Sequence, residues 1–301
     1  MNILVIGKAK TGTTVISKTI QKSISGPTQY HLEPKRIGFF EQEHFAKSDC
    51  SHIVKIIFEH WSNTPRMRNA IIHNEAVLKF DKVICIVRDL RDEIISRLMY
   101  LIYPYQFEYH LKAEQVAAWL DILEKKEKSP QSIAFVELFA EFEKIFKVSF
   151  SGELNHSIMQ SKIYYDFIQG PAKNSYRIKY EDFITGKLQL LEEYFGFSVS
   201  SDRTVDDLER TKRSVTFNNW KKIFTAEDVE FFKPKLSLIL EKFGYLDWEL
   251  EESDKLESEH YSGYVKHLLN PNPNKIKSLH ICNNDIANSY SIPKIGEHNN
   301  G

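Results

Sequence analysis

Short apolar runs alternate with longer amphipathic stretches along most of this chain. Residues 53–58 and 83–87 are nearly continuous apolar runs, which is typical of parallel strands covered on both faces. Together with shorter runs elsewhere, they predict strands at 3–7, 29–32, 53–58, 82–87 and 176–180.

Apolar positions with helical spacing lie between and after these runs. They predict helices at 64–78, 91–103, 111–126, 131–147, 153–168, 186–195 and 225–243. Thr225, followed by Glu227 and Asp228, is a good start for the last of these helices. Strands that alternate with helices imply a three-layer α/β/α fold with a central, mainly parallel sheet.

The chain has 301 residues, enough for one large α/β domain. Its composition changes near 249, where an acidic stretch begins, and beyond 269 it is rich in Asn, Pro and Ser. We therefore expect a main domain over 1–249 and a peripheral tail over 250–301, partly disordered or draped over the domain.

Charge and cysteine content narrow the function classes. The net charge of −1 argues against a general nucleic-acid or membrane-surface binder, which would carry a basic excess. Cys50, Cys85 and Cys282 are far apart, as in a reduced intracellular protein without structural zinc. The N-terminal apolar run is too short for a signal peptide, and no stretch is long enough to span a membrane. We expect a soluble, cytoplasmic protein.

The loop after the first predicted strand carries the strongest chemical signal. Gly7, Gly12 and Thr14 fit the phosphate-binding pattern G-x-x-x-x-G-K-[ST], but Thr13 stands where that pattern has lysine, and the lysine is Lys10. A loop between a strand and a helix directs backbone N–H groups at an anion, which the helix dipole also favours. The loop is predicted to bind phosphate, but not as an ordinary ATPase does.

A second candidate phosphate contact follows the strand at 82–87. Arg88 stands at the carboxyl end of that strand, where open α/β sheets bind ligands, and Ser96 lies eight residues later in the next helix. A planar guanidinium suits phosphate oxygens, and a serine hydroxyl can donate to another oxygen. On its own, an arginine at this place is also a common salt-bridge partner.

Together the two segments resemble the sulfotransferase family that uses 3′-phosphoadenosine 5′-phosphosulfate (PAPS). Residues 10–14 are similar to that family's P-K-S-G-T-T loop, with Ala9 in place of the proline and Thr11 in place of the serine. Arg88 and Ser96 match its 3′-phosphate pair at the family spacing.

Two later segments extend the resemblance, which covers roughly residues 3–245. Residues 177–182, with Tyr180, resemble the R-Y-E-D segment, whose tyrosine lies near the nucleotide. Arg213 with 219–221 resembles the late R-K-G-x-x-G-D-W-K stretch, although Ser214, Val215 and Asn218 depart from it.

The resemblance implies a P-loop NTPase-like sulfotransferase fold, of a bacterial-type small-molecule or carbohydrate enzyme. It implies that Thr11, Gly12, Thr13 and Thr14 hold the 5′-phosphate, and that Lys10 neutralises the leaving oxygen. The 3′-phosphate would be held by Arg88, Ser96 and Arg213, and PAPS would be the co-substrate. Nothing in this scheme requires a metal, and no cluster of His, Cys and Asp has ligand spacing.

The base that activates the acceptor has several candidates. Residues 55–57 stand where the cytosolic branch of the family has a K-T-H segment, so the expected histidine is missing. Glu33, followed by Pro34, resembles the E-P segment of carbohydrate and some bacterial sulfotransferases, and Glu59 and His60 follow the next strand. Lys55 lies in an otherwise apolar strand, where a buried lysine needs a partner, and is a candidate for contact with the sulfuryl group or the substrate.

The expected activity is sulfuryl transfer from PAPS to a hydroxyl or amine of a small-molecule or glycan acceptor. The alternatives are a P-loop kinase of small metabolites that uses ATP–Mg²⁺, and a nucleotide-binding protein without catalysis. The aromatic-rich segment 100–109 either lines the acceptor pocket or packs in the core. Among partners, the acceptor and a second copy of the chain are expected, and neither nucleic acid nor a membrane.

Overall fold

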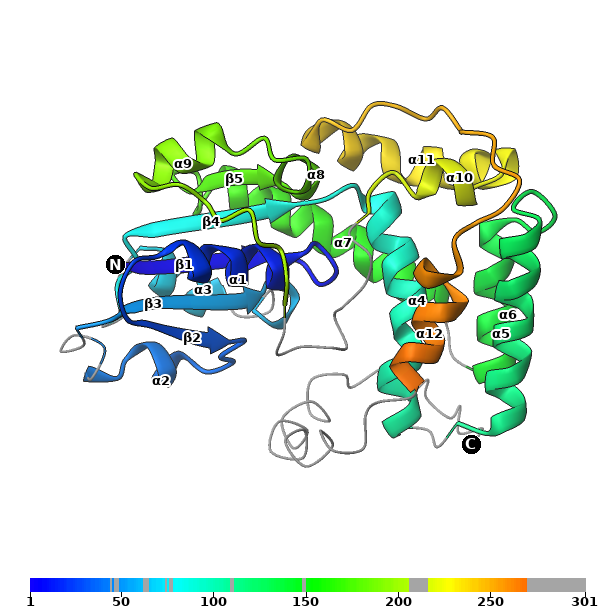
Figure 1. Cartoon of the computed structure of the whole chain (residues 1–301), viewed down its shortest axis with the longest axis horizontal. Coiled ribbons are helices and arrows are strands. Elements are labelled where there is room, and N and C mark those ends of the chain that lie inside the picture. The colour runs from blue at the N-terminus through cyan, green and yellow to red at the C-terminus, as the bar shows by residue number, and fades with distance from the viewer. Residues whose placement is uncertain are drawn as a thin grey trace, which may run out of the picture.

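The computed structural model describes residues 1–43, 45, 49–61, 65–73, 75, 78–108, 111–147, 150–205 and 216–269. Its centre is a five-stranded sheet with the order β2-β3-β1-β4-β5, in which every neighbouring pair is parallel (Figure 1). The strands are β1 (Asn2–Gly7), β2 (Thr28–Leu32), β3 (Ser51–Ile57), β4 (Lys82–Val87) and β5 (Tyr176–Lys179). All five predicted strands are confirmed.

Helices connect and cover the strands. The longer ones are α1 (Thr13–Ser23), α3 (Pro65–Ile72), α4 (Leu90–Glu108), α5 (Ala113–Lys128), α6 (Phe135–Phe146), α7 (Phe150–Gln169), α9 (Gln189–Phe195), α11 (Ala226–Phe243) and α12 (Ser262–Leu269). The short ones are α2 (Ile37–Phe40), η2 (Phe58–His60), α8 (Tyr180–Ile184), α10 (Trp220–Ile223) and η4 (Ser258–His260). The predicted start of α11 is confirmed, because the Thr225 hydroxyl accepts a hydrogen bond from the Asp228 N–H.

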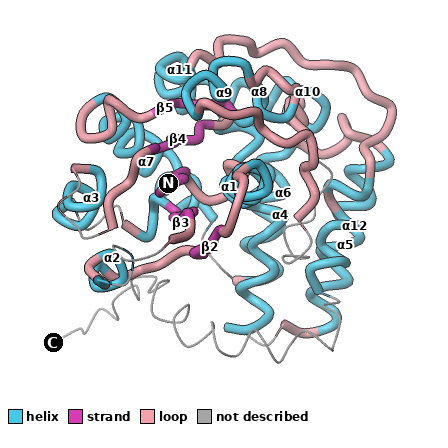
Figure 2. Tube along the Cα trace, turned by 60° about the vertical axis from the view of Figure 1, so that its left-hand side comes forward, coloured by secondary structure: helices cyan, strands magenta, loops and turns pink. Residues whose placement is uncertain are grey.

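The two faces of the sheet pack against different helices (Figure 2). Along β1, Ile3 and Val5 pack in a cluster with residues of α1, α8 and α9, whereas Leu4 and Ile6 pack with residues of α3 and α7. This alternation follows from the strand period of two and gives the predicted three-layer α/β/α architecture.

A third hydrophobic cluster lies among the helices beside the sheet (Figure 1). It joins α4, α5, α6, α10, α11 and α12, and its largest fully buried side chains include Trp119, Phe142 and Trp220. α4 begins directly after β4 and reaches from the sheet into this cluster, so it links the carboxyl end of the sheet to the helical part.

Residues 250–269 pack into this helical cluster. Tyr261, Tyr264, Val265 and Leu268 are buried there, and the Glu127 carboxylate of α5 accepts hydrogen bonds from the N–H and hydroxyl of Ser262. The structure thus places this part of the expected peripheral tail in the core, where α12 lies along α4 (Figure 1). The sequence did not predict α12 because its apolar residues follow an acidic stretch that is typical of a tail. Residues 270–301 lie outside the described residues.

In the described part of the chain, none of the helices has the length and apolar character that crossing a membrane requires.

Candidate active site

The loop between β1 and α1 has a backbone that only certain residues tolerate. Gly12 caps α1 with φ +81°, and a Cβ added there would lie 2.3 Å from the ring of Tyr180. Lys10 also has a positive φ, 68°, which is strained for a residue with a side chain. The glycine of the predicted phosphate loop is therefore required for both conformation and space.

A tight turn closes the first part of this loop. The N–H and the hydroxyl of Thr11 both donate to the carbonyl of Lys8, at 3.3 and 2.7 Å. Thr11 and Thr13 are buried and Thr14 is partly buried. The N–H groups of the first turn of α1 have no carbonyl partner within the helix, so this turn offers donors to an anion.

Arg88 connects the loop to the carboxyl end of β4. It donates to the Lys10 carbonyl at 2.8 Å and to the Thr216 carbonyl at 3.3 Å, and its guanidinium lies 4.6 Å from the centre of the Tyr180 ring. Its buried Nε–H has no hydrogen-bond partner among the described residues. Lys10 and Gly12 of the loop, Arg88 and Tyr180, predicted from three separate segments, thus lie together.

The structure does not test the assignment of Ser96 and Arg213, the two other residues predicted to hold the 3′-phosphate. Ser96 is buried in α4, and the structure gives no contact between it and Arg88 within the described residues. Arg213 lies outside the described residues. Their assignments stay predictions.

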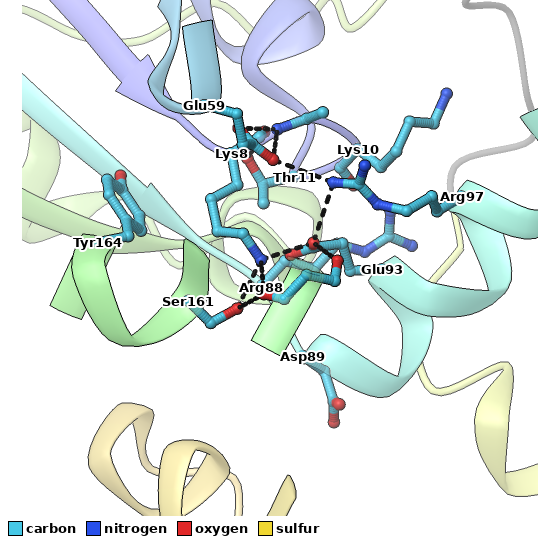
Figure 3. Close-up of polar contacts among 12 residues, drawn as sticks. Lys8, Lys10, Thr11, Glu59, Arg88, Asp89, Glu93, Arg97, Ser161 and Tyr164 are labelled. Atoms are coloured by element: carbon cyan, nitrogen blue, oxygen red, sulfur yellow. Dashed lines mark hydrogen bonds and ion pairs between the residues drawn. The ribbon is translucent and has the colours of Figure 1, made fainter. Parts of the chain in front are cut away.

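Lys8 anchors the loop to a buried network of charges that the sequence interpretation missed. Its Nζ lies 2.7 Å from Glu93 Oε1 and 2.5 Å from Ser161 Oγ, and it also donates to the Ser157 carbonyl. Figure 3 shows Lys8 directed at Glu93 and Ser161, whereas the Lys10 side chain points away from them. Glu93 lies on α4 and Ser161 on α7, so Lys8 fastens the loop to two helices.

Glu59, a candidate base, is part of the same network. Its carboxylate accepts from the Ala9 N–H at 2.9 and 3.1 Å, and lies 3.0 Å from the Arg97 guanidinium (Figure 3). Arg97 also lies 3.7 Å from Glu93, which connects Glu59 to Lys8. Both Glu59 oxygens are thus engaged by the loop backbone and one also by Arg97, so the geometry favours a positioning role for Glu59.

Lys55 and Glu33, two further candidates, form an ion pair with each other. Lys55 is buried in β3, and its Nζ contacts Glu33 Oε1 at the end of β2. The Glu33 N–H also donates to the Lys55 carbonyl at 2.7 Å, and Glu33 has a positive φ of 52°. The expectation that Lys55 needs a partner is therefore met by Glu33, which stays partly exposed.

His60 lies at the end of η2, directly after Glu59. Burial is the main cause that lowers the pKa of its imidazole below the usual value, and Lys35 and Lys55 act in the same direction. Glu33 and Glu59 oppose this change. The ring is therefore mainly neutral at neutral pH and able to accept a proton.

Acidic side chains surround Arg88 on the side of α4 and α8. Asp92 is buried, its Oδ1 accepts from the Trp220 N–H at 3.0 Å, and Oδ2 has no partner among the described residues. Burial raises the pKa of Asp92 to about 6, with Asp89 and Glu181 adding to the rise and Arg88 opposing it. Burial also raises the pKa of Glu181, which accepts from the Asp89 N–H and the Tyr245 hydroxyl.

Within the described residues, no group of three or more His, Cys, Asp or Glu side chains is arranged to hold a metal ion. The carboxyl end of the sheet also carries Arg88, Lys10 and the N–H groups at the start of α1, which are donors that suit an anionic ligand.

Comparison with known proteins gives a distant structural likeness. No family model and no curated protein sequence matches the chain. Among solved structures, it is similar to mouse sulfotransferase SULT7A1, which was determined as a complex with PAP. The identity is 14%, the match covers 79% of this chain and 84% of that chain, and the TM-score is 0.45. This identity and this TM-score are too low to support a conclusion about function.

Proposed function

We propose that this protein is a sulfotransferase that moves a sulfuryl group from PAPS to a hydroxyl or amine of a small-molecule or glycan acceptor. The observation that carries the proposal is the convergence of Lys10, Gly12, Arg88 and Tyr180 at the carboxyl end of β1 and β4. The resemblance assigns them to PAPS from three different segments of the sequence, the loop of Lys10 and Gly12, the end of the strand before Arg88, and the segment of Tyr180.

In this proposal, the loop and Arg88 hold the two phosphate groups of the donor. The N–H groups and hydroxyls of residues 11–14 would bind the 5′-phosphate at the start of α1. Arg88 would bind the 3′-phosphate with its Nε–H, which has no hydrogen-bond partner among the described residues. Tyr180, buried against Gly12 and stacked on Arg88, would lie beside the nucleotide.

The proposed reaction is an in-line displacement at sulfur. The acceptor oxygen or nitrogen forms a bond to sulfur while the bond from sulfur to the 5′-phosphate oxygen breaks, and the acceptor proton passes to a base. The products are the sulfated acceptor and PAP. Lys10 would neutralise the charge that grows on the leaving phosphate, which is where a preorganised cation contributes most.

We propose Glu33 as the base, because it lies at the carboxyl end of β2 and is more exposed than Glu59. Lys55 would orient the Glu33 carboxylate through their ion pair. His60 is the alternative base. If His60 takes the acceptor proton, His60→Ala removes turnover and Glu33→Gln does not. Assays of both variants with an identified acceptor decide between them.

Calorimetric titration tests the donor. The protein is expected to bind PAP more tightly than ATP–Mg²⁺, because the loop has Thr13 in the place of the kinase lysine and Arg88 offers a site for a 3′-phosphate. A preference for ATP–Mg²⁺ would support the kinase alternative and contradict the proposal.

Transfer of label from PAPS to a panel of acceptors tests the chemistry. Lys10→Ala is expected to lower turnover by about 100-fold or more, as losses of a charge-stabilising donor do. PAP binding without transfer to any acceptor, by a fully folded protein, would favour a nucleotide-binding protein without catalysis.

A further inference from the structure

The side chain of Lys10 extends from the phosphate loop to a defined contact on α4. Its Nζ lies 3.7 Å from the centre of the Tyr100 ring, within the range of a cation–π contact. Tyr100 is on α4 and stacks on the buried Tyr103 one turn later, with ring centres 5.5 Å apart. The ring under the ammonium is therefore itself held by the helix.

The backbone of Lys10 is held independently. Its positive φ of 68° is unfavourable for a lysine, and Arg88 donates to its carbonyl at 2.8 Å. Arg88 thus fixes the main chain of this residue, and Tyr100 holds the far end of its side chain. A lysine side chain has four rotatable bonds, so a contact at each end removes most of its freedom.

We propose that Tyr100 is a positioning residue for Lys10, which keeps the ammonium group at the phosphate loop before the donor binds. This inference rests on the sulfotransferase function proposed above. An ammonium group that is already placed needs little reorganisation when charge grows on the leaving phosphate. Tyr100 should therefore affect turnover more than donor affinity.

The test compares variants that keep or remove the aromatic face. Tyr100→Phe keeps the ring, and Tyr100→Leu removes it, with Tyr100→Met as a second ring-free variant should the leucine variant fold poorly. The matched control is Phe231→Leu, which removes an exposed ring 3.6 Å from Lys235 on α11.

Steady-state kinetics with PAPS provide the first readout. Tyr100→Leu is expected to lower kcat about 3- to 30-fold, the size of a cation–π contact, with a change in PAP affinity of less than about threefold. Tyr100→Phe and Phe231→Leu should retain wild-type kcat. An unchanged kcat in both ring-free variants, or an equal loss in Tyr100→Phe, would overturn the proposal.

A second readout does not depend on activity. After reductive methylation with ¹³C, the Lys10 methyl resonance, identified by its absence in Lys10→Arg, should be shifted upfield by the Tyr100 ring. The shift should disappear in Tyr100→Leu and persist in Tyr100→Phe and Phe231→Leu. A Lys10 resonance that is the same in all variants would overturn the contact.

The two readouts separate this inference from the function on which it rests. Suppose that the wild-type protein does not bind PAP but Tyr100 still shifts the Lys10 resonance. The proposed sulfotransferase function is then wrong, and so is the role of Tyr100 in transfer, whereas the contact between Tyr100 and Lys10 is confirmed. If the wild type transfers sulfuryl groups and Lys10 shows no ring shift, only the role of Tyr100 is overturned.

Discussion

The two halves of the loop between β1 and α1 each contain a lysine, but the two lysine side chains have different surroundings. In the first half, Lys8 is buried and bound to Glu93 and Ser161, and the Ala9 N–H is bound to Glu59. In the second half, the Lys10 side chain points away from this network (Figure 3). Its ammonium group lies over the Tyr100 ring, and its backbone is held by Arg88.

This difference separates the first half of the loop, which anchors the loop to the protein, from the second half, which is proposed to bind the donor. The Lys8 ammonium group and the Ala9 N–H donate hydrogen bonds to side chains of α4, α7 and η2, and these bonds fasten the loop to the three helices. The first turn of α1, in contrast, has N–H groups without a carbonyl partner inside the helix, and these are the groups proposed to bind the anion. Two lysines that look equivalent in sequence therefore have different expected effects when they are removed.

The largest expected effect is on stability, from loss of Lys8. Lys8→Met leaves the Glu93 carboxylate buried without its closest cation and should lower the free energy of unfolding by about 3–5 kcal/mol. Lys10→Met should change it by less than about 1 kcal/mol, because Lys10 is only partly buried. Urea denaturation measures both variants.

A double variant is the control for this prediction. Lys8→Met with Glu93→Gln removes the unpaired charge and should recover part of the loss. Equal destabilisation by Lys8→Met and Lys10→Met would erase the proposed distinction between the halves.

The second prediction concerns the glycine that begins α1. Gly12→Ala should destabilise the protein by about 2–4 kcal/mol, because it combines a positive φ with a Cβ 2.3 Å from the Tyr180 ring. Gly26→Ala is the matched control, since Gly26 also has a positive φ, 93°, but in the described part of the chain no atom lies within 4 Å of its added Cβ. Gly26→Ala should cost only about 1 kcal/mol in thermal or urea unfolding. Similar losses in the two variants would mean that the Tyr180 contact contributes nothing.

The smallest expected effect is a pH dependence at the Arg88 end of the site. The pKa of Asp92 is raised from 3.8 to about 6 in the folded protein, so the folded state binds its proton more tightly than the unfolded state. This contribution to stability is complete below pH 3.8 and is lost as the pH rises through about 6.

Asp92→Asn isolates this contribution. The free energy of unfolding of the wild type, relative to Asp92→Asn, should fall by about 2–3 kcal/mol between about pH 4 and about pH 8. Parallel pH curves for the two proteins would show that Asp92 titrates normally.

The sequence predicted the five strands because their apolar runs are short and bounded, and parallel strands bring their carboxyl ends to one edge. That rule alone places Arg88 near the loop that contains Lys10. The need of Lys55 for a partner could also be predicted, since a lysine in an apolar strand must be paired.

The charge network behind the loop could not be predicted in the same way. Lys8 and Glu93 are 85 residues apart, and their contact depends on how α4 and α7 pack against the sheet. The spacing of Glu93 and Arg97, four residues apart on one helix face, was the available signal. The place of α12 was missed for a related reason, because its apolar residues follow an acidic stretch that is typical of a tail.

A crystal structure with PAP tests the central claim most directly, that the second half of the loop and Arg88 form the donor site. We expect the 5′-phosphate on the N–H groups of residues 11–14 and the 3′-phosphate on Arg88, with Lys8 still bound to Glu93. PAP bound elsewhere, or phosphates that contact Lys8 while Arg88 stays on the Lys10 carbonyl alone, would contradict it.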